Sequence, residues 1–239
     1  MNAFIGVDLG WYGKPSGLAS IRLQDTVLHL GKIARLESTD EILDWIDAEA
    51  GPNCAVGVDA PLAIRNQHGI RPTERALNRD FRRFHAGCHA ANLGRPFAPK
   101  VLEFSRRLAE LGFRHEPAAR PRRKGRFQIE VHPHAAMVEL FELDRIVKYK
   151  RGLRAHRASE LRRLRGLMLR HLPDQIPPLS LQLPSVPTSG NLKPVEDRID
   201  AVLCAYIAAH WWYWGAARNY IYGDAEDGCI VVPRPSHPA

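Results

Sequence analysis

Two short apolar runs that each end in an aspartate constrain the fold of this chain more than any other feature. The first, AFIGVD, spans residues 3–8 and leads toward a glycine, and the second, CAVGVD, spans residues 54–59 and is soon stopped by a proline. Continuous apolar runs of this length are typical of strands that are buried on both faces. We therefore predict two buried strands that present Asp8 and Asp59 at their carboxyl ends.

The segment between these runs indicates how the two strands are arranged. Residues 18–23 and 27–36 have strand-like patterns, which together with the first run predict an antiparallel meander of three strands. Ser38 and Glu41 form a capping box that begins an amphipathic helix. A strand that follows such a crossover helix pairs parallel to the first strand, so both aspartates should meet at one edge of the sheet.

Three further carboxylates occur where a strand or a helix could direct them toward the same point. Glu130 lies near the end of RFQIEV, residues 126–131, whose alternation predicts another parallel strand. Asp197 and Asp200 are one turn apart on a long helix predicted for residues 195–214, and this spacing puts both on one helical face. Structural alternatives are an ordinary exposed strand residue for Glu130 and a favourable helix-dipole position for Asp197.

Carboxylates that converge in this way predict a metal site. They repel one another unless protons or cations neutralise them, and hard divalent ions such as Mg²⁺ bind oxygen ligands. The segment HAGCH at residues 85–89 also looks like a ligand set, but no second cluster with zinc spacing accompanies it. We therefore give zinc less weight than a structural or substrate-facing role for these residues.

Basic residues exceed acidic ones and are concentrated in a few segments. Lys and Arg number 34 against 26 Asp and Glu, which leaves a net charge of +8. Dense positive charge attracts polyanions by counterion release, so nucleic acid is the partner to consider, although solvated helix faces are the commoner cause of such runs. The candidate phosphate contacts are Arg75, Arg79 and Arg82 on one face of a predicted helix and, in two other basic segments, Arg122, Arg123, Lys124, Lys148, Lys150 and Arg151.

The length and the remaining composition set the organisation that we expect. We predict one α/β domain over residues 1–239, with an irregular and helical insertion at about 61–125 and a Pro-rich loop at about 173–194. No run approaches the roughly 20 apolar residues of a membrane span, and no signal-peptide layout precedes the first strand. A cytoplasmic protein without membrane contact is therefore expected, and its widely spaced cysteines imply no disulfides.

Four motifs together resemble one known family. GVDLGW, VGVDAPL, IEVHPHA and DRIDAVLCAY, in this order, resemble the domain of unknown function 429 family, described as predicted nucleases of the RNase H-like fold. The resemblance covers nearly the whole chain and implies a mixed five-stranded sheet, its first three strands antiparallel, flanked by helices. Similarity to the Holliday-junction resolvase branch of that fold implies catalytic and metal-binding roles for Asp8, Asp59, Asp197 and Asp200 with Mg²⁺ or Mn²⁺. It leaves the catalytic status of Glu130 open.

The activity that this resemblance implies is hydrolysis of phosphodiester bonds in DNA or RNA. Two metal ions about 3.5–4 Å apart would activate water and stabilise the departing oxygen. Asp8 would bridge the two ions, Asp59 and Asp200 would each complete one of them, and Asp197 would assist at the second. His132 and His134 are candidates for moving protons or orienting the ligands.

Two other functions fit parts of the sequence. The loop after Asp8, followed by Ser16-Gly17, resembles the first phosphate loop of the sugar-kinase and actin superfamily, but those phosphotransferases surround ATP with two such domains and we predict one. A non-catalytic nucleic-acid binder of the same fold would make the basic segments primary. The tryptophans of residues 211–214 are typical of helix packing or a homodimer surface rather than of base stacking.

Overall fold

The first strand of the chain lies in the interior of a mixed eight-stranded sheet in the computed structural model, which describes residues 2–234. β1 (Asn2–Asp8) pairs antiparallel with β2 (Ser16–Gln24), and β2 pairs antiparallel with β3 (Val27–Leu36). The complete strand order is β6-β3-β2-β1-β4-β5-β8-β7. The predicted antiparallel meander is therefore confirmed.

The crossover that follows the meander brings two aspartates to neighbouring strand ends. α1 (Thr39–Glu49) begins with the predicted capping box and leads to β4 (Asn53–Val58), which pairs parallel with β1. The amide of Asp59 donates a hydrogen bond of 2.9 Å to the carbonyl of Val7, so it continues the register of the two strands. Asp8 and Asp59 consequently lie at the same edge of the sheet, as the sequence predicts.

The elements between β4 and the last helix follow the sequence prediction closely. The helices and strand are α2 (Pro72–Phe81), α3 (Ala98–Glu110), β5 (Arg126–Val131), α4 (Pro133–Leu140) and α5 (Arg154–His171). β5 pairs parallel with β4, which confirms the predicted third parallel-type strand. Short 3-10 turns follow β1, α2, α5 and α6 at residues 11–13, 82–84, 172–174 and 215–218.

The sheet has eight strands rather than the five that the resemblance implies. β8 (Gly228–Pro233) pairs parallel with β5 and antiparallel with β7 (Asn219–Asp224), and β6 (Leu179–Ser180) pairs with β3 at the other edge. The short strand β6 and the strand β7 were not predicted from the sequence. β6 is only two residues long, and the mixed polarity of β7 gives little period-two signal.

α6 (Lys193–Trp214) crosses one face of the sheet at very short range and packs against β1, β2 and β4. A Cβ added at Gly6 would lie 1.9 Å from the Ala201 carbonyl oxygen, and one added at Gly17 would lie 2.0 Å from the Asp197 carbonyl oxygen. Glycine is thus required at both positions for the backbones to approach. This approach brings the two aspartates of α6 close to the end of β1.

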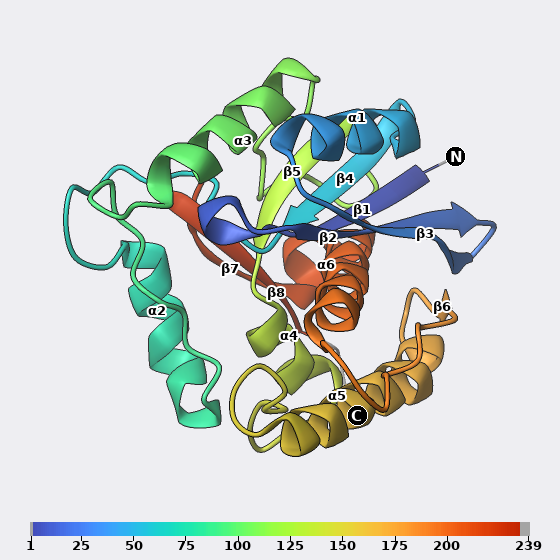
Figure 1. Ribbon diagram of the computed structural model, residues 1–239. Coiled ribbons are helices and arrows are strands. Elements are labelled where there is room, and N and C mark those ends of the chain that lie inside the picture. The colour runs from blue at the N-terminus through green and yellow to red at the C-terminus, as the bar shows by residue number, and fades with distance from the viewer. Residues whose placement is uncertain (1, 235–239) are drawn as a thin grey trace.

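Helices cover both faces of the sheet, as Figure 1 shows. α1 and α3 pack on one face, while α4, α5 and α6 lie on the other. The indole nitrogens of Trp211, Trp212 and Trp214 donate hydrogen bonds to backbone carbonyls of this chain, in keeping with a role in helix packing. Among the described residues, no helix has the length and apolarity needed to cross a bilayer.

Candidate functional site

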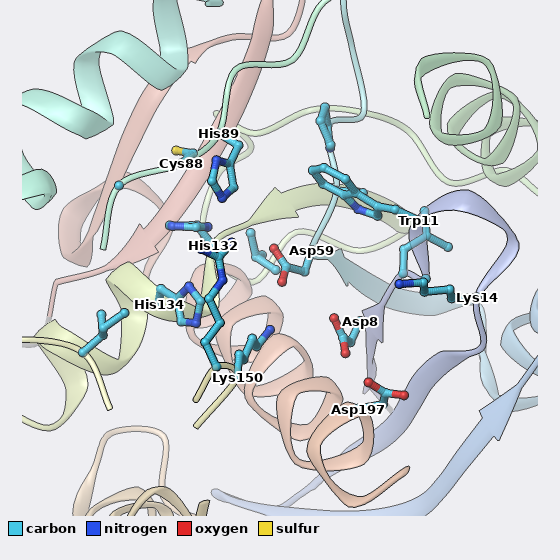
Figure 2. A pocket seen from close by; sticks show the side chains of 18 of the residues that line it. Asp8, Trp11, Lys14, Asp59, Cys88, His89, His132, His134, Lys150 and Asp197 are labelled. Carbon is cyan, nitrogen blue, oxygen red and sulfur yellow. The ribbon is translucent and has the colours of Figure 1, made fainter. Parts of the chain in front are cut away.

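A cavity of about 1070 Å³ opens where β1, β4 and β5 end. Its lining includes Asp8, Asp59, Glu130 and Asp197, which are four of the five carboxylates singled out in the sequence. Figure 2 shows Asp8 and Asp59 near one another, with Trp11 and Lys14 on one side and His89, His132 and His134 on the other. Ligands of open α/β sheets bind beyond the carboxyl ends of the strands, so this is the candidate site.

Asp8 and Asp59 are the two carboxylates of the site without a bonded cation. Within residues 2–234, neither has a side-chain hydrogen bond or an ion pair. Burial raises the pKa of Asp8 well above its usual range and that of Asp59 to about 6, and nearby Asp200 raises both further while Lys150 opposes the rise. When Asp8 and Asp59 are both ionised, their negative charges therefore repel each other, and neither carboxylate has an ion-pair partner.

Asp200 lies beneath the cavity and is held by two neighbours. The Tyr149 hydroxyl donates a hydrogen bond of 2.7 Å to Oδ1, and the Lys150 Nζ lies 2.9 Å from Oδ2. Burial alone would lower the pKa of Lys150, but Asp200, Asp8 and Asp59 hold it well above its usual value. Lys150 is therefore the positive charge that these three aspartates share.

Asp197 lines the cavity, but both of its oxygens are already engaged. The Arg35 Nε lies 2.8 Å from Oδ2, and the Lys193 Nζ lies 2.7 Å from Oδ1. Arg35 comes from β3 and Lys193 from the first turn of α6, so the carboxylate joins the sheet to the helix. In this arrangement Asp197 fixes the start of α6 over β2.

Glu130 is paired with a buried arginine at the margin of the cavity. The Arg71 guanidinium donates to both carboxylate oxygens, at 2.6 and 3.0 Å, and the Leu62 amide donates at 3.2 Å. Arg71 also donates to Glu74 at 2.9 Å. Such bidentate contacts are strong and directional, and here they tie β5 to the start of α2 and to the loop after β4.

Burial disfavours the charged form of two histidines of the site, His132 and His134. Burial lowers the pKa of His132 to about 4 and that of His134 well below its usual value. The Nε2 of His132 lies 3.0 Å from the Ala86 carbonyl oxygen, which can only accept, so Nε2 carries the proton and Nδ1 is free to accept one. His85, Cys88 and His89 line the same cavity, and burial raises the pKa of the Cys88 thiol, which therefore stays protonated.

The basic residues predicted to contact nucleic acid do not share one surface, and seven of the nine line three different cavities. Arg75, Arg79 and Arg82 line a shallow cavity of about 540 Å³ beside α2, and Arg123 lines a third cavity of about 960 Å³. Arg122 lies over the Tyr213 ring, and Lys124 is exposed. Those that line the main cavity are Lys148, Lys150 and Arg151.

Several residues of the site were not found by the sequence analysis. Trp11, Tyr12 and Lys14 line the cavity from the loop after β1, and Lys193 lines it from α6. The signal available for the first three was their position, because residues that directly follow a strand ending in a catalytic-type aspartate share its edge of the sheet. Lys193 is placed by the packing of α6, which the sequence does not reveal.

The donor atoms can be compared with the needs of a divalent cation. Among residues 2–234, no three His, Cys, Asp or Glu side chains already have the arrangement of a metal site. Asp8 and Asp59 nevertheless offer carboxylate oxygens of the kind that Mg²⁺ and Mn²⁺ prefer. Oδ2 of Asp200 is buried and accepts no hydrogen bond, and its cationic neighbour is Lys150. The donor set therefore fits a hard cation, which would compete with the Lys150 ammonium.

Comparisons with known proteins place the chain in a family. A search of curated proteins found no match. The profile of the family described as "Protein of unknown function (DUF429)" matches residues 6–227, a span that contains all five carboxylates discussed above. The match confirms the family resemblance drawn from the four sequence motifs. The chain belongs to the DUF429 family.

Proposed function

We propose that this protein is a metal-dependent hydrolase of phosphodiester bonds in nucleic acid, with its reactive centre at Asp8 and Asp59. The observation that carries the proposal is that these carboxylates end adjacent parallel strands, face one cavity and lack a bonded cation, while burial and nearby Asp200 raise the pKa of each. A divalent cation would relieve the repulsion between these two carboxylates.

The strand order supports an RNase H-like core for this activity. The central strands β3-β2-β1-β4-β5 consist of an antiparallel meander followed by two strands parallel to β1. That is the arrangement implied by the family resemblance. β8 and β7 at one edge and β6 at the other are then additions to this core.

Several polar residues of the cavity have a role in this proposal. Asp8 and Asp59 would hold the cation, and Asp200 would be a third ligand if its ion pair with Lys150 opened. When bound, the cation supplies Lewis-acid stabilisation of charge on the phosphate and lowers the pKa of water. His132 accepts a proton at Nδ1. The residues that bind the phosphates are Lys14, Lys148, Arg151 and Lys193.

Asp197 and Glu130 act as positioning residues in this scheme. Their oxygens are bonded to Arg35 and Lys193 and to Arg71, so they set the geometry of α6 and β5 around the cavity. The prediction that Asp197 assists a second metal would require these ion pairs to break. We therefore propose that one cation, held by Asp8 and Asp59, binds first.

A non-catalytic nucleic-acid binder is the second candidate, and the ion pair of Lys150 with Asp200 favours it. This pair neutralises part of the acidic cluster without any metal ion. A protein of this kind would bind nucleic acid equally well with and without divalent cations, and replacing Asp8 by asparagine would preserve or raise its affinity.

Cleavage assays distinguish the two candidates. Labelled single-stranded and duplex DNA and RNA are incubated with Mg²⁺, with Mn²⁺ or with a chelator. We expect cation-dependent cleavage that falls by at least about a hundredfold in Asp8→Asn, because one ligand of the cation is lost. Asp44→Asn, which removes an exposed carboxylate from α1, is the control and should retain activity. Absence of cation-dependent cleavage of every substrate, or equal cleavage by Asp8→Asn, would refute the hydrolase.

A further inference from the structure

Two strongly exposed apolar side chains line the main cavity. In the described part of the chain three large apolar residues are strongly exposed, namely Tyr12 at 61%, Leu153 at 82% and Ile176 at 53%. Tyr12 and Leu153 both line the cavity, although they come from the loop after β1 and from the residue before α5. Exposed apolar side chains that line a common cavity are typical of a ligand surface, whereas scattered ones are not.

Trp11 extends this surface inward. Its ring lies 4.2 Å from the ring centre of Phe97 at an interplanar angle of 36°, and Phe97 itself is buried. Tyr12 meets the same Phe97 ring edge-on, with centroids 6.2 Å apart. Phe97 therefore supports both aromatic residues from behind, while Trp11 and Tyr12 line the cavity (Figure 2 labels Trp11).

The loop that carries these rings is held in one conformation. The Gly10 amide donates to the Ser16 hydroxyl at 2.9 Å, and the Lys100 ammonium donates to the Gly10 carbonyl at 3.0 Å. Tyr12 has a left-handed backbone, with φ of 58° and ψ of 38°, which is uncommon for an aromatic residue. Strained residues that the surroundings hold in place cluster at ligand-binding sites, and the side chain of Tyr12 stays 61% exposed despite its edge-on contact with Phe97.

Positive charge lines the same cavity beside the aromatic surface. The contributing residues are Lys14, Lys148, Lys150, Arg151 and Lys193. Figure 2 shows Lys14 on the same side of the cavity as Trp11. A ligand that matches this lining has a planar apolar part and an adjoining anion. An unpaired nucleotide has both parts, because its base presents a π-face and its phosphate is anionic.

We propose that the main cavity binds an unpaired nucleotide of a single-stranded nucleic acid, with the base stacked against Trp11 and Tyr12 and the phosphate beside the basic residues. This inference rests on the proposed function in one respect only, that the bound phosphate lies where Asp8 and Asp59 could act on it. A base within a duplex is stacked on both faces and must be extruded before it can reach these rings. The site therefore selects single strands, loops or frayed ends over regular duplex.

Binding without cleavage tests the inference. Fluorescence anisotropy with a chelator present compares four probes: a labelled single-stranded oligonucleotide, the same strand in a duplex, an abasic strand of equal length, and a labelled mononucleotide. We expect the single strand to bind at least about tenfold more tightly than each of the others, since stacking contributes a factor of roughly five to a hundred per base.

Variants assign the selectivity to the aromatic surface. Tyr12→Ala should weaken binding of the single strand roughly five- to hundredfold and leave binding of the abasic strand unchanged. Tyr12→Phe keeps the ring and should bind as wild type does. Tyr213→Ala removes an aromatic ring of α6 that lies outside the cavity lining and serves as the matched control. The oligonucleotide should also quench tryptophan fluorescence, and Trp11→Phe should abolish that quenching.

The outcomes separate this inference from the hydrolase. Equal binding of the single strand by wild type and Tyr12→Ala overturns the stacking site even if cleavage is observed. Equal affinity for the duplex, for the abasic strand or for the free mononucleotide also overturns it, as does failure of the single strand to bind. Selective single-strand binding without cation-dependent cleavage supports the stacking site and refutes the hydrolase.

Discussion

Asp8 and Asp59 differ from Glu130, Asp197 and Asp200 in what neutralises them. Glu130 is bonded to Arg71, Asp197 to Arg35 and Lys193, and Asp200 to Lys150. Asp8 and Asp59 have no bonded cation in the described chain. Asp8, Asp59 and Glu130 lie at or near the ends of strands, and Asp197 and Asp200 lie in the first half of α6. A buried charge needs a partner, so the carboxylates whose partner is missing are the ones available to a ligand.

The largest effect on stability is expected when Glu130, which is paired with Arg71, is replaced. Glu130→Gln leaves the buried Arg71 guanidinium without its bidentate partner, and breaking a buried ion pair costs about 3–5 kcal/mol. For a chain of this size that corresponds to a fall in Tm of about 6–20 °C in thermal unfolding. Glu103→Gln breaks an exposed pair with Arg106 and should cost less than about 1 kcal/mol. If the two variants lose equal stability, the Glu130–Arg71 pair is not a structural element.

The opposite effect on stability is expected when Asp59, which has no ion-pair partner, is replaced. The folded protein raises the pKa of Asp59 from 3.8 to about 6, so its carboxyl favours the folded state at low pH and this contribution is lost as the pH rises through about 6. Asp59→Asn should therefore stabilise the cation-free protein at pH 7, by on the order of 2 kcal/mol or about 4–8 °C.

The pH dependence provides the internal control for Asp59→Asn. The advantage of the variant should shrink as the pH falls from 7 toward 4, and adding Mn²⁺ should stabilise wild type more than the variant. A variant that is less stable than wild type at pH 7 without divalent cations would show that Asp59 is a structural residue like Glu130.

Lys150 connects the two groups, because it bonds to Asp200 and is close enough to lower the pKa of both Asp8 and Asp59. Lys150→Met removes a cation that competes with a metal ion for these carboxylates. We expect Mn²⁺ to bind about tenfold more tightly in isothermal titration calorimetry. Lys124→Met removes an exposed lysine that does not line the main cavity, and it should leave the affinity for Mn²⁺ unchanged. Weaker Mn²⁺ binding by Lys150→Met would mean that Lys150 supports the site instead of competing for it.

The smallest effect is expected at the basic residues outside the cavity. Arg79 is exposed on α2 and lines the shallow cavity beside that helix. Arg79→Ala should change the free energy of unfolding by less than about 0.5 kcal/mol and the affinity for single-stranded DNA by less than about twofold. Arg151→Ala, in the main cavity, should weaken that affinity by roughly two- to fivefold, as loss of one phosphate contact does. The reverse order would move the nucleic-acid surface to α2.

Local patterns in the sequence were sufficient to predict the strands that carry Asp8 and Asp59, because an apolar run, a terminal aspartate and a capped crossover helix all act over short distances. The capping box at Ser38 and the strand over residues 126–131 were predicted for the same reason. The parallel pairing then followed from the handedness of the connection.

The partners of the acids could not be predicted in this way. Arg71 lies 59 residues before Glu130, and Arg35 lies 162 residues before Asp197, so only the folded sheet brings them together. Lys150 was predicted as a phosphate contact, and its ion pair with Asp200 depends on how the segment before α5 packs beneath α6. The aromatic surface of Trp11 and Tyr12 could not be predicted either, because it depends on packing against Phe97, which is distant in the sequence.

Anomalous diffraction from a crystal soaked in Mn²⁺ tests the central claim most directly. We predict a strong peak within coordination distance of carboxylate oxygens of both Asp8 and Asp59, together with movement of the Lys150 ammonium away from Asp200. Absence of a peak at this position at millimolar Mn²⁺, with Lys150 still paired to Asp200, would contradict the proposal that these two aspartates form a cation site.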